Sequence, residues 1–135
     1  MAKTNKIPDA VIFDSSVWIA YMKKADTQHA KAIQIFEETD GQKIMVPEYV
    51  ALEVSSVLAV RVTRILANNF LEIISDNSDI DILYSDRTFF TKTATLFRTS
   101  PTNRLSFTDT ALLNLSRQYE VITFDTDLAR AIKNI

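Results

Sequence analysis

Two aspartates each stand directly after a short apolar run, at a position where a carboxylate can take part in chemistry. Asp14 follows residues 11–13 and Asp125 follows residues 121–124, and both runs are rich in β-branched or aromatic side chains. Such a run predicts a strand that is buried on both faces of a parallel sheet. Open α/β sheets place their ligands at the carboxyl ends of their strands, so both aspartates are candidate site residues. Taken singly, each could instead be the N-cap of the helix that follows it.

Two further acids belong to expected helices. The residues at i±3 and i±4 of Glu53 are mostly apolar, and burial of an ionised carboxylate without a partner is costly. Glu53 is therefore a candidate ligand, although an edge position in water or a pair with Arg61 would also explain it. Asp109 lies three residues after Ser106. This is the spacing of a capping box, and by itself it indicates helix capping rather than catalysis.

Helix capping explains each acid singly but does not explain why several of them are expected near one edge of the sheet. Carboxylates gathered without matching lysines need a cation to neutralise them. The chain has no cysteine and one histidine, so the available ligands are oxygen atoms, which suit Mg²⁺ or Mn²⁺ better than zinc. The net charge of −2 argues weakly against nucleic acid held by bulk electrostatics, unless such a cation presents the positive charge to a phosphate.

The elements that must position these acids alternate between strands and helices. Apolar patterns predict strands at residues 11–14, 43–46, 80–84 and 121–124, and helices at residues 15–21, 27–40, 47–60, 63–74, 85–97, 106–119 and 128–132. The helix after Pro47 is apolar nearly all round and is expected to be largely buried. Ser85 is expected to cap its helix, and residues 1–9 to form a frayed lead-in. The alternation predicts one α/β domain over residues 1–135, with a parallel sheet covered by helices.

Composition excludes several classes of protein. No apolar run approaches the ~18 residues that span a bilayer, and no hydrophobic signal segment follows Met1. We therefore expect a cytoplasmic protein with no membrane partner. The absence of cysteine excludes disulfides and thiolate chemistry. A single glycine excludes a glycine-rich phosphate loop.

Taken in order, these motifs resemble a PIN domain, a family of metal-dependent ribonucleases best known as VapC-type toxins of toxin–antitoxin pairs. The resemblance rests on Asp14-Ser-Ser-Val-Trp, on Glu53 within an apolar helix, on Leu105-Ser106-Phe107-Thr108-Asp109 and on Thr123-Phe124-Asp125-Thr126-Asp127-Leu128. It implies a three-layer α/β/α sandwich with strand order 3-2-1-4-5, in which the first and fourth strands lie side by side. Because the chain ends at Ile135, the fifth strand is expected to be short or absent.

The resemblance also implies roles for individual residues. The catalytic acids would be Asp14, Glu53, Asp109 and Asp125, and the ligands of Mg²⁺ (or Mn²⁺) would be these four with Asp127. Hydrogen bonds from Ser16, Ser106 and Thr123 would support the acids, and Arg104 would contact the substrate.

The implied activity is that of an endoribonuclease which hydrolyses RNA phosphodiester bonds and leaves a 3′-hydroxyl and a 5′-phosphate. The implied partners are an RNA substrate such as a tRNA or mRNA, a cognate antitoxin and a second copy of the chain. Alternatives are a PIN nuclease of RNA processing, or a PIN-like module that only binds protein. A more remote alternative is a Mg²⁺-dependent aspartyl phosphoacceptor domain. That class needs an adjacent acid pair after its first strand, where this chain has Phe13-Asp14.

Overall fold

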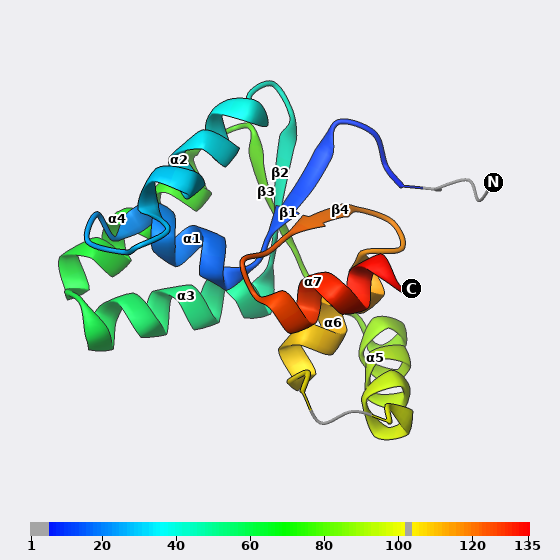
Figure 1. Ribbon diagram of the computed structural model, residues 1–135. Coiled ribbons are helices and arrows are strands. Elements are labelled where there is room, and N and C mark those ends of the chain that lie inside the picture. The colour runs from blue at the N-terminus through cyan, green and yellow to red at the C-terminus, as the bar shows by residue number, and fades with distance from the viewer. Residues whose placement is uncertain (1–5, 102–103) are drawn as a thin grey trace.

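A four-stranded parallel sheet forms the centre of the protein in the computed structural model, which describes residues 6–101 and 104–135 (Figure 1). The strands are β1 (Ala10–Phe13), β2 (Lys43–Pro47), β3 (Ile80–Leu83) and β4 (Glu120–Ile122). The helices are α1 (Ser15–Met22), α2 (His29–Glu38), α3 (Glu48–Arg61), α4 (Arg64–Asp76), α5 (Arg87–Thr99), α6 (Phe107–Leu115) and α7 (Thr126–Lys133). Figure 1 shows α1 to α4 grouped on one side and α5 to α7 on the other.

The strand order is β3-β2-β1-β4, which confirms the predicted order and the α/β/α class. No fifth strand follows α7 in the part of the chain that the structure describes. The chain crosses over after β3 to place β4 beside β1, so the carboxyl ends of β1 and β4 are neighbours. Phe13 pairs with Ile122 in the parallel register of these two strands. This juncture is where the order of the strands reverses, and it is where such sheets bind their ligands.

β1 is the central buried strand, as its apolar run predicts. The side chains of Val11, Ile12 and Phe13 are all fully buried. They share one hydrophobic core with Trp18 of α1 and Phe70 of α4, among others. β1 is therefore held rigidly at the point where Asp14 leaves it.

The N-caps of three helices can be compared with the sequence. Thr63 caps α4 by accepting a hydrogen bond from the Leu66 N–H (3.0 Å), at the predicted start of that helix. Asp14 caps α1, which is one of the two roles that the sequence left open for it. The prediction that Ser85 caps α5 is wrong, because Asp86 accepts the hydrogen bond from the Phe89 N–H (2.8 Å). Serine and aspartate are nearly equal as N-caps, so composition could not decide which of two neighbouring positions takes the role.

The expectation that the helix after Pro47 is largely buried is also wrong. In α3, only Val50, Val54 and Leu58 are fully buried, and they follow one another at intervals of four residues. Leu52 is 65% exposed and Val60 is 84% exposed. The helix therefore buries one narrow stripe and leaves these two apolar side chains in solvent, because α1, α4 and the sheet cover only part of its circumference.

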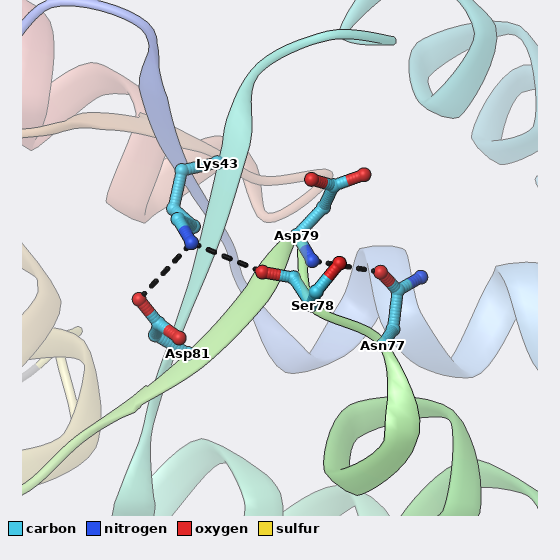
Figure 2. Close-up of polar contacts among 5 residues, drawn as sticks. All are labelled: Lys43, Asn77, Ser78, Asp79 and Asp81. Atoms are coloured by element: carbon cyan, nitrogen blue, oxygen red, sulfur yellow. Dashed lines mark hydrogen bonds and ion pairs between the residues drawn. The ribbon is translucent and has the colours of Figure 1, made fainter.

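At the amino-terminal end of the sheet, Lys43 of β2 makes polar contacts with β3 and with the turn before it (Figure 2). The Lys43 ammonium lies 3.4 Å from the Asp81 carboxylate and donates a hydrogen bond to the Ser78 carbonyl (3.0 Å). The Asp79 N–H donates to the side chain of Asn77 (2.8 Å), while the Asp79 carboxylate points away from Lys43. Asp79 is thus an exposed acid at the opposite end of the sheet from Asp14.

Before β1, the Ile7 N–H donates a hydrogen bond to the Gln118 carbonyl (2.6 Å), which anchors the part of the lead-in that the structure describes. Residues 1–5 of the expected lead-in lie outside the described residues. Among the described residues, no helix has the length and apolar character needed to cross a bilayer.

Candidate active site

Asp14 is a buried acid, only 5% exposed, at the junction of β1 and α1. One of its carboxylate oxygens accepts hydrogen bonds from the N–H and the hydroxyl of Ser15, at 2.6 and 3.2 Å. The other accepts from the Ser16 hydroxyl (3.0 Å) and from the Thr123 hydroxyl. Four donors from three residues therefore hold the carboxylate in one orientation. Hydrogen bonds to an ionised group are stronger than those between neutral groups, and they offset the cost of burying its charge.

The same hydroxyls connect Asp14 to the segment after β4. Ser16 accepts a hydrogen bond from the Phe124 N–H (3.1 Å), and Thr123 accepts one from the Asp125 N–H (2.9 Å). A hydroxyl can donate one bond and accept others, so each side chain acts as a bridge. The position of Asp125 is thus tied, through Thr123, to the carboxylate of Asp14.

Asp125 is exposed and caps α7, accepting a hydrogen bond from the Leu128 N–H at 3.0 Å. Its capping role and its position beside Asp14 do not exclude each other. One carboxylate oxygen satisfies the helix, and the rest of the group remains in contact with solvent.

Asp109 forms the predicted capping box with Ser106 at the start of α6. The Asp109 N–H donates to the Ser106 hydroxyl and the Ser106 N–H donates to the Asp109 carboxylate, both at 3.0 Å. Burial raises the pKa of the Asp109 carboxyl above its ordinary value, the hydrogen bonds with Ser106 lower it, and the negative charges of Asp14 and Asp125 raise it further. Three acids that are far apart in the sequence therefore share one electrostatic environment.

A comparison with models of known protein families matches residues 11–134 to the PIN domain. The chain belongs to the PIN domain family. The match covers Asp14 and Asp125 and the whole sheet except Ala10, the first residue of β1, and it agrees with the resemblance seen in the sequence.

Among solved structures, six chains match this PIN domain. One is VapC20 of Mycobacterium tuberculosis, described as a toxin that cleaves the sarcin–ricin loop, with a TM-score of 0.77 and 17% sequence identity. The similarity covers 90% of this chain and 94% of that one. At this level of identity the likeness shows a shared fold. The search of curated proteins found no match.

Two other acids predicted for the site of this PIN domain have different surroundings. Glu53 lies in the second turn of α3 and is exposed. No described hydrogen bond or ion pair involves Glu53. Of the alternatives that the sequence left open, the structure therefore shows an edge position with the carboxylate in water. Asp127 is half-buried and pairs with Arg130 (3.5 Å) and Arg104 (3.7 Å). Arg104 thus lies beside α7, and the ligand roles of Glu53 and Asp127 stay predictions.

The carboxylate oxygens of Asp14, Asp109 and Asp125 are ligands of the kind that a hard divalent cation prefers. In the described part of the chain, neither lysine nor arginine forms an ion pair with Asp14, Asp109 or Asp125. The described residues also contain no cluster of three or more acidic, histidine or cysteine ligands already closed around one point. Magnesium does not require such a cage, because it keeps several of its waters and uses one or two carboxylates. The chemistry of these carboxylates therefore suits a partly hydrated Mg²⁺ or Mn²⁺ held by one or two of them.

Sequence reasoning missed Ser15, whose N–H and hydroxyl both bind Asp14. The available signal was that Asp14 is a good N-cap, since an N-cap carboxylate commonly accepts from nearby backbone amides. The role of the Phe124 N–H as a donor to Ser16 had no signal in the sequence, because a backbone amide is present at every position except proline.

Proposed function

We propose that this PIN domain is a Mg²⁺- or Mn²⁺-dependent endoribonuclease whose catalytic acids are Asp14, Asp109, Asp125 and Glu53. The observation that carries the proposal is the link from the Asp14 carboxylate through the Thr123 hydroxyl to the Asp125 backbone at the carboxyl end of the sheet. Asp109 lies close enough for the charges of both acids to raise the pKa of its carboxyl. Like charges held together repel one another and need neutralisation. A cation bound there would relieve the repulsion and attract a phosphate.

Asp14, Asp109 and Asp125 would hold the cation, with Glu53 and Asp127 as further ligands. When bound, such an ion stabilises the negative charge that develops on a phosphodiester and lowers the pKa of a water molecule. The protein's own contribution is to fix the acids in advance. Ser16 and Thr123 orient Asp14, and Thr123 also positions the Asp125 backbone, so little rearrangement is needed when the substrate arrives.

The products would carry a 3′-hydroxyl and a 5′-phosphate, and the substrate would be a structured RNA such as a tRNA or mRNA. The similarity in fold to a VapC toxin supports the role of toxin in a type II toxin–antitoxin pair in the cytoplasm, with a cognate antitoxin as partner. Exposed apolar side chains on α3 and α4 support a homodimer, because Leu52, Val60 and Ile65 all lie open to solvent. Large apolar side chains that are exposed together commonly mark a protein–protein contact.

A cleavage assay tests the nuclease function. Wild type, Asp14→Asn and Asp79→Asn are incubated with structured RNAs in Mg²⁺, in Mn²⁺ and in EDTA. Wild type and the Asp79→Asn control should cleave only with metal, since Asp79 lies at the opposite end of the sheet. Asp14→Asn should lose about a hundredfold or more in rate, because stabilisation of the transition state by a metal is worth several kcal/mol. Cleavage in EDTA, or equal cleavage by Asp14→Asn, would contradict the assignment.

A further inference from the structure

An aromatic cavity lies between α3, α5 and α6, at the same edge of the sheet as the acids. It has a volume of about 210 Å³ and is lined by Tyr49, Phe89, Phe90, Thr93, Phe107 and Thr108, among others. Tyr49 follows the carboxyl end of β2, and Thr108 immediately precedes Asp109 in the first turn of α6. The wall of the cavity is therefore continuous along the chain with the proposed active site. We refer to this cavity as the aromatic pocket.

Exposed phenyl rings stand at the aromatic pocket. Phe90 is 57% exposed and Phe107 is 38% exposed, although each packs edge-to-face against a neighbour. The centroid of the Phe107 ring lies 5.6 Å from that of Phe90 and 5.4 Å from that of Phe97. Rings of this size normally avoid water, so a cluster of them at the surface indicates a binding site.

Few residues in the lining of the pocket are polar. Thr93 and Thr108 are among them. Tyr49 also forms part of the wall, but its hydroxyl is buried and has no hydrogen-bond partner among the described residues. Flat apolar walls with a few polar groups suit a planar, polar-edged ligand.

The charge of α5 identifies the class of that ligand. The helix carries Arg87, Lys92 and Arg98 and contains no acidic residue. A second copy of the chain docked symmetrically through this face would bring two such basic helices together, which is unfavourable. A polyanion gains from the same charges. Basic side chains combined with aromatic rings are how proteins bind unpaired nucleic acid.

We propose that the aromatic pocket receives one unpaired base of the RNA substrate beside the bond that is cut, while α5 holds the flanking phosphates. This inference rests on the proposed nuclease function for its substrate. Phe107 and Phe90 would stack on the base, and the ring of Tyr49 would form part of the pocket wall. Proteins that recognise RNA by sequence usually bind bases that are unstacked in loops. Phe107 and Phe90 would then be residues that determine specificity.

The test separates base recognition from binding to the phosphate backbone. Two pools of fluorescein-labelled RNA hairpins are prepared, one with a randomised loop and one with the same loop made abasic. Affinities are measured by fluorescence anisotropy in EDTA, so that the RNA stays intact. The proteins are wild type, Phe107→Ala, Lys92→Gln, and the controls Ile7→Ala and Lys24→Gln, which remove an exposed apolar group and an exposed positive charge elsewhere.

Phe107→Ala should weaken binding of the randomised pool by about 5- to 100-fold, the value of one lost stacking contact, and should leave binding of the abasic pool unchanged. Lys92→Gln should weaken both pools alike, because it removes a phosphate contact. Both controls should bind as wild type does. Equal effects of Phe107→Ala on the two pools, or no effect on either, would overturn the proposal.

Phe90→Leu supplies a second variant that keeps an apolar side chain. It should melt within about 2 °C of wild type, because Phe90 is 57% exposed, and it should bind the randomised pool less tightly while binding the abasic pool as wild type does. Light scattering on Phe107→Ala tests whether a second copy of the chain, rather than RNA, binds at the aromatic pocket. If that variant turns a dimer into a monomer while RNA affinity is unchanged, the face is a contact between copies and the proposal is wrong.

Cleavage of the randomised pool by wild type in Mg²⁺ is measured separately. Binding that depends on the bases without any cleavage would refute the nuclease function and keep the base site. Cleavage with equal affinity for the two pools would refute the base site and keep the nuclease.

Discussion

Replacing Thr123 with valine keeps the shape of the side chain and removes only its hydroxyl. That hydroxyl donates to the Asp14 carboxylate and accepts from the Asp125 N–H. A hydrogen bond to a charged group contributes about 1.5–3 kcal/mol and a neutral one about 1 kcal/mol. Because Thr123 is only half-buried, water replaces part of what is lost. We expect Thr123→Val to lower the free energy of unfolding by about 2 kcal/mol, and the Tm by about 8 °C for a domain of this size.

The matched control is Thr95→Val in α5. Its side chain is exposed, and among the described residues its hydroxyl bonds only to the Thr91 carbonyl in the preceding turn (3.0 Å), so the loss should stay within about 0.5 kcal/mol. Urea unfolding without metal measures both variants. In the double variant Asp14→Asn/Thr123→Val, the second change should cost less than it does alone, because the charged acceptor is gone. Equal destabilisation by Thr123→Val and Thr95→Val would refute the view that this hydroxyl joins the two halves of the site.

Three further predictions concern the acids and their support. Asp109→Asn should raise the metal-free Tm at neutral pH. The pKa of the Asp109 carboxyl is raised in the folded protein, so the ionised carboxylate lowers the stability of wild type at pH values above that pKa. The difference in Tm between the variant and wild type should vanish below about pH 4, where the acid is protonated in both the folded and the unfolded protein. Mg²⁺ should raise the Tm of wild type more than that of Asp109→Asn, and an equal rise in both would exclude Asp109 as a ligand. Glu53→Gln should leave the metal-free Tm within about 2 °C of wild type, because the side chain is exposed, and a large loss would reveal a structural ion pair. Ser106→Ala should cost about 1 kcal/mol in urea unfolding, since it removes one half of the capping box; no measurable loss would show that the box adds nothing to α6.

Local features of the fold followed well from the sequence. The apolar run of β1, the Thr63 cap and the Ser106–Asp109 capping box each depend on neighbouring residues alone, and the structure contains all three. The same local reasoning failed for α3. Its pattern shows that the helix is apolar, but not how much of its circumference the other elements cover.

The candidate site depends on distance in space rather than in sequence. Asp14 and Thr123 are separated by 109 positions and are joined by a hydrogen bond. Each of Asp14, Asp109 and Asp125 also caps a helix or belongs to a capping box. Local reasoning alone therefore could not tell an acid that only caps from one that also belongs to the site.

The sequence by itself determined the strands, the acid that follows each of two strands, and the oxygen-only chemistry of the candidate ligands, because these depend on residue type and local periodicity. Only the tertiary structure decided which acids meet. The crossover that brings β4 beside β1 places Asp125 next to Asp14, and the packing of α6 brings Asp109 within their electrostatic reach. The same packing left Glu53 in solvent and opened the aromatic pocket between α3, α5 and α6. Electrostatic and hydrogen-bond energies depend on the separation of groups in space, and that separation exists only once the chain has folded.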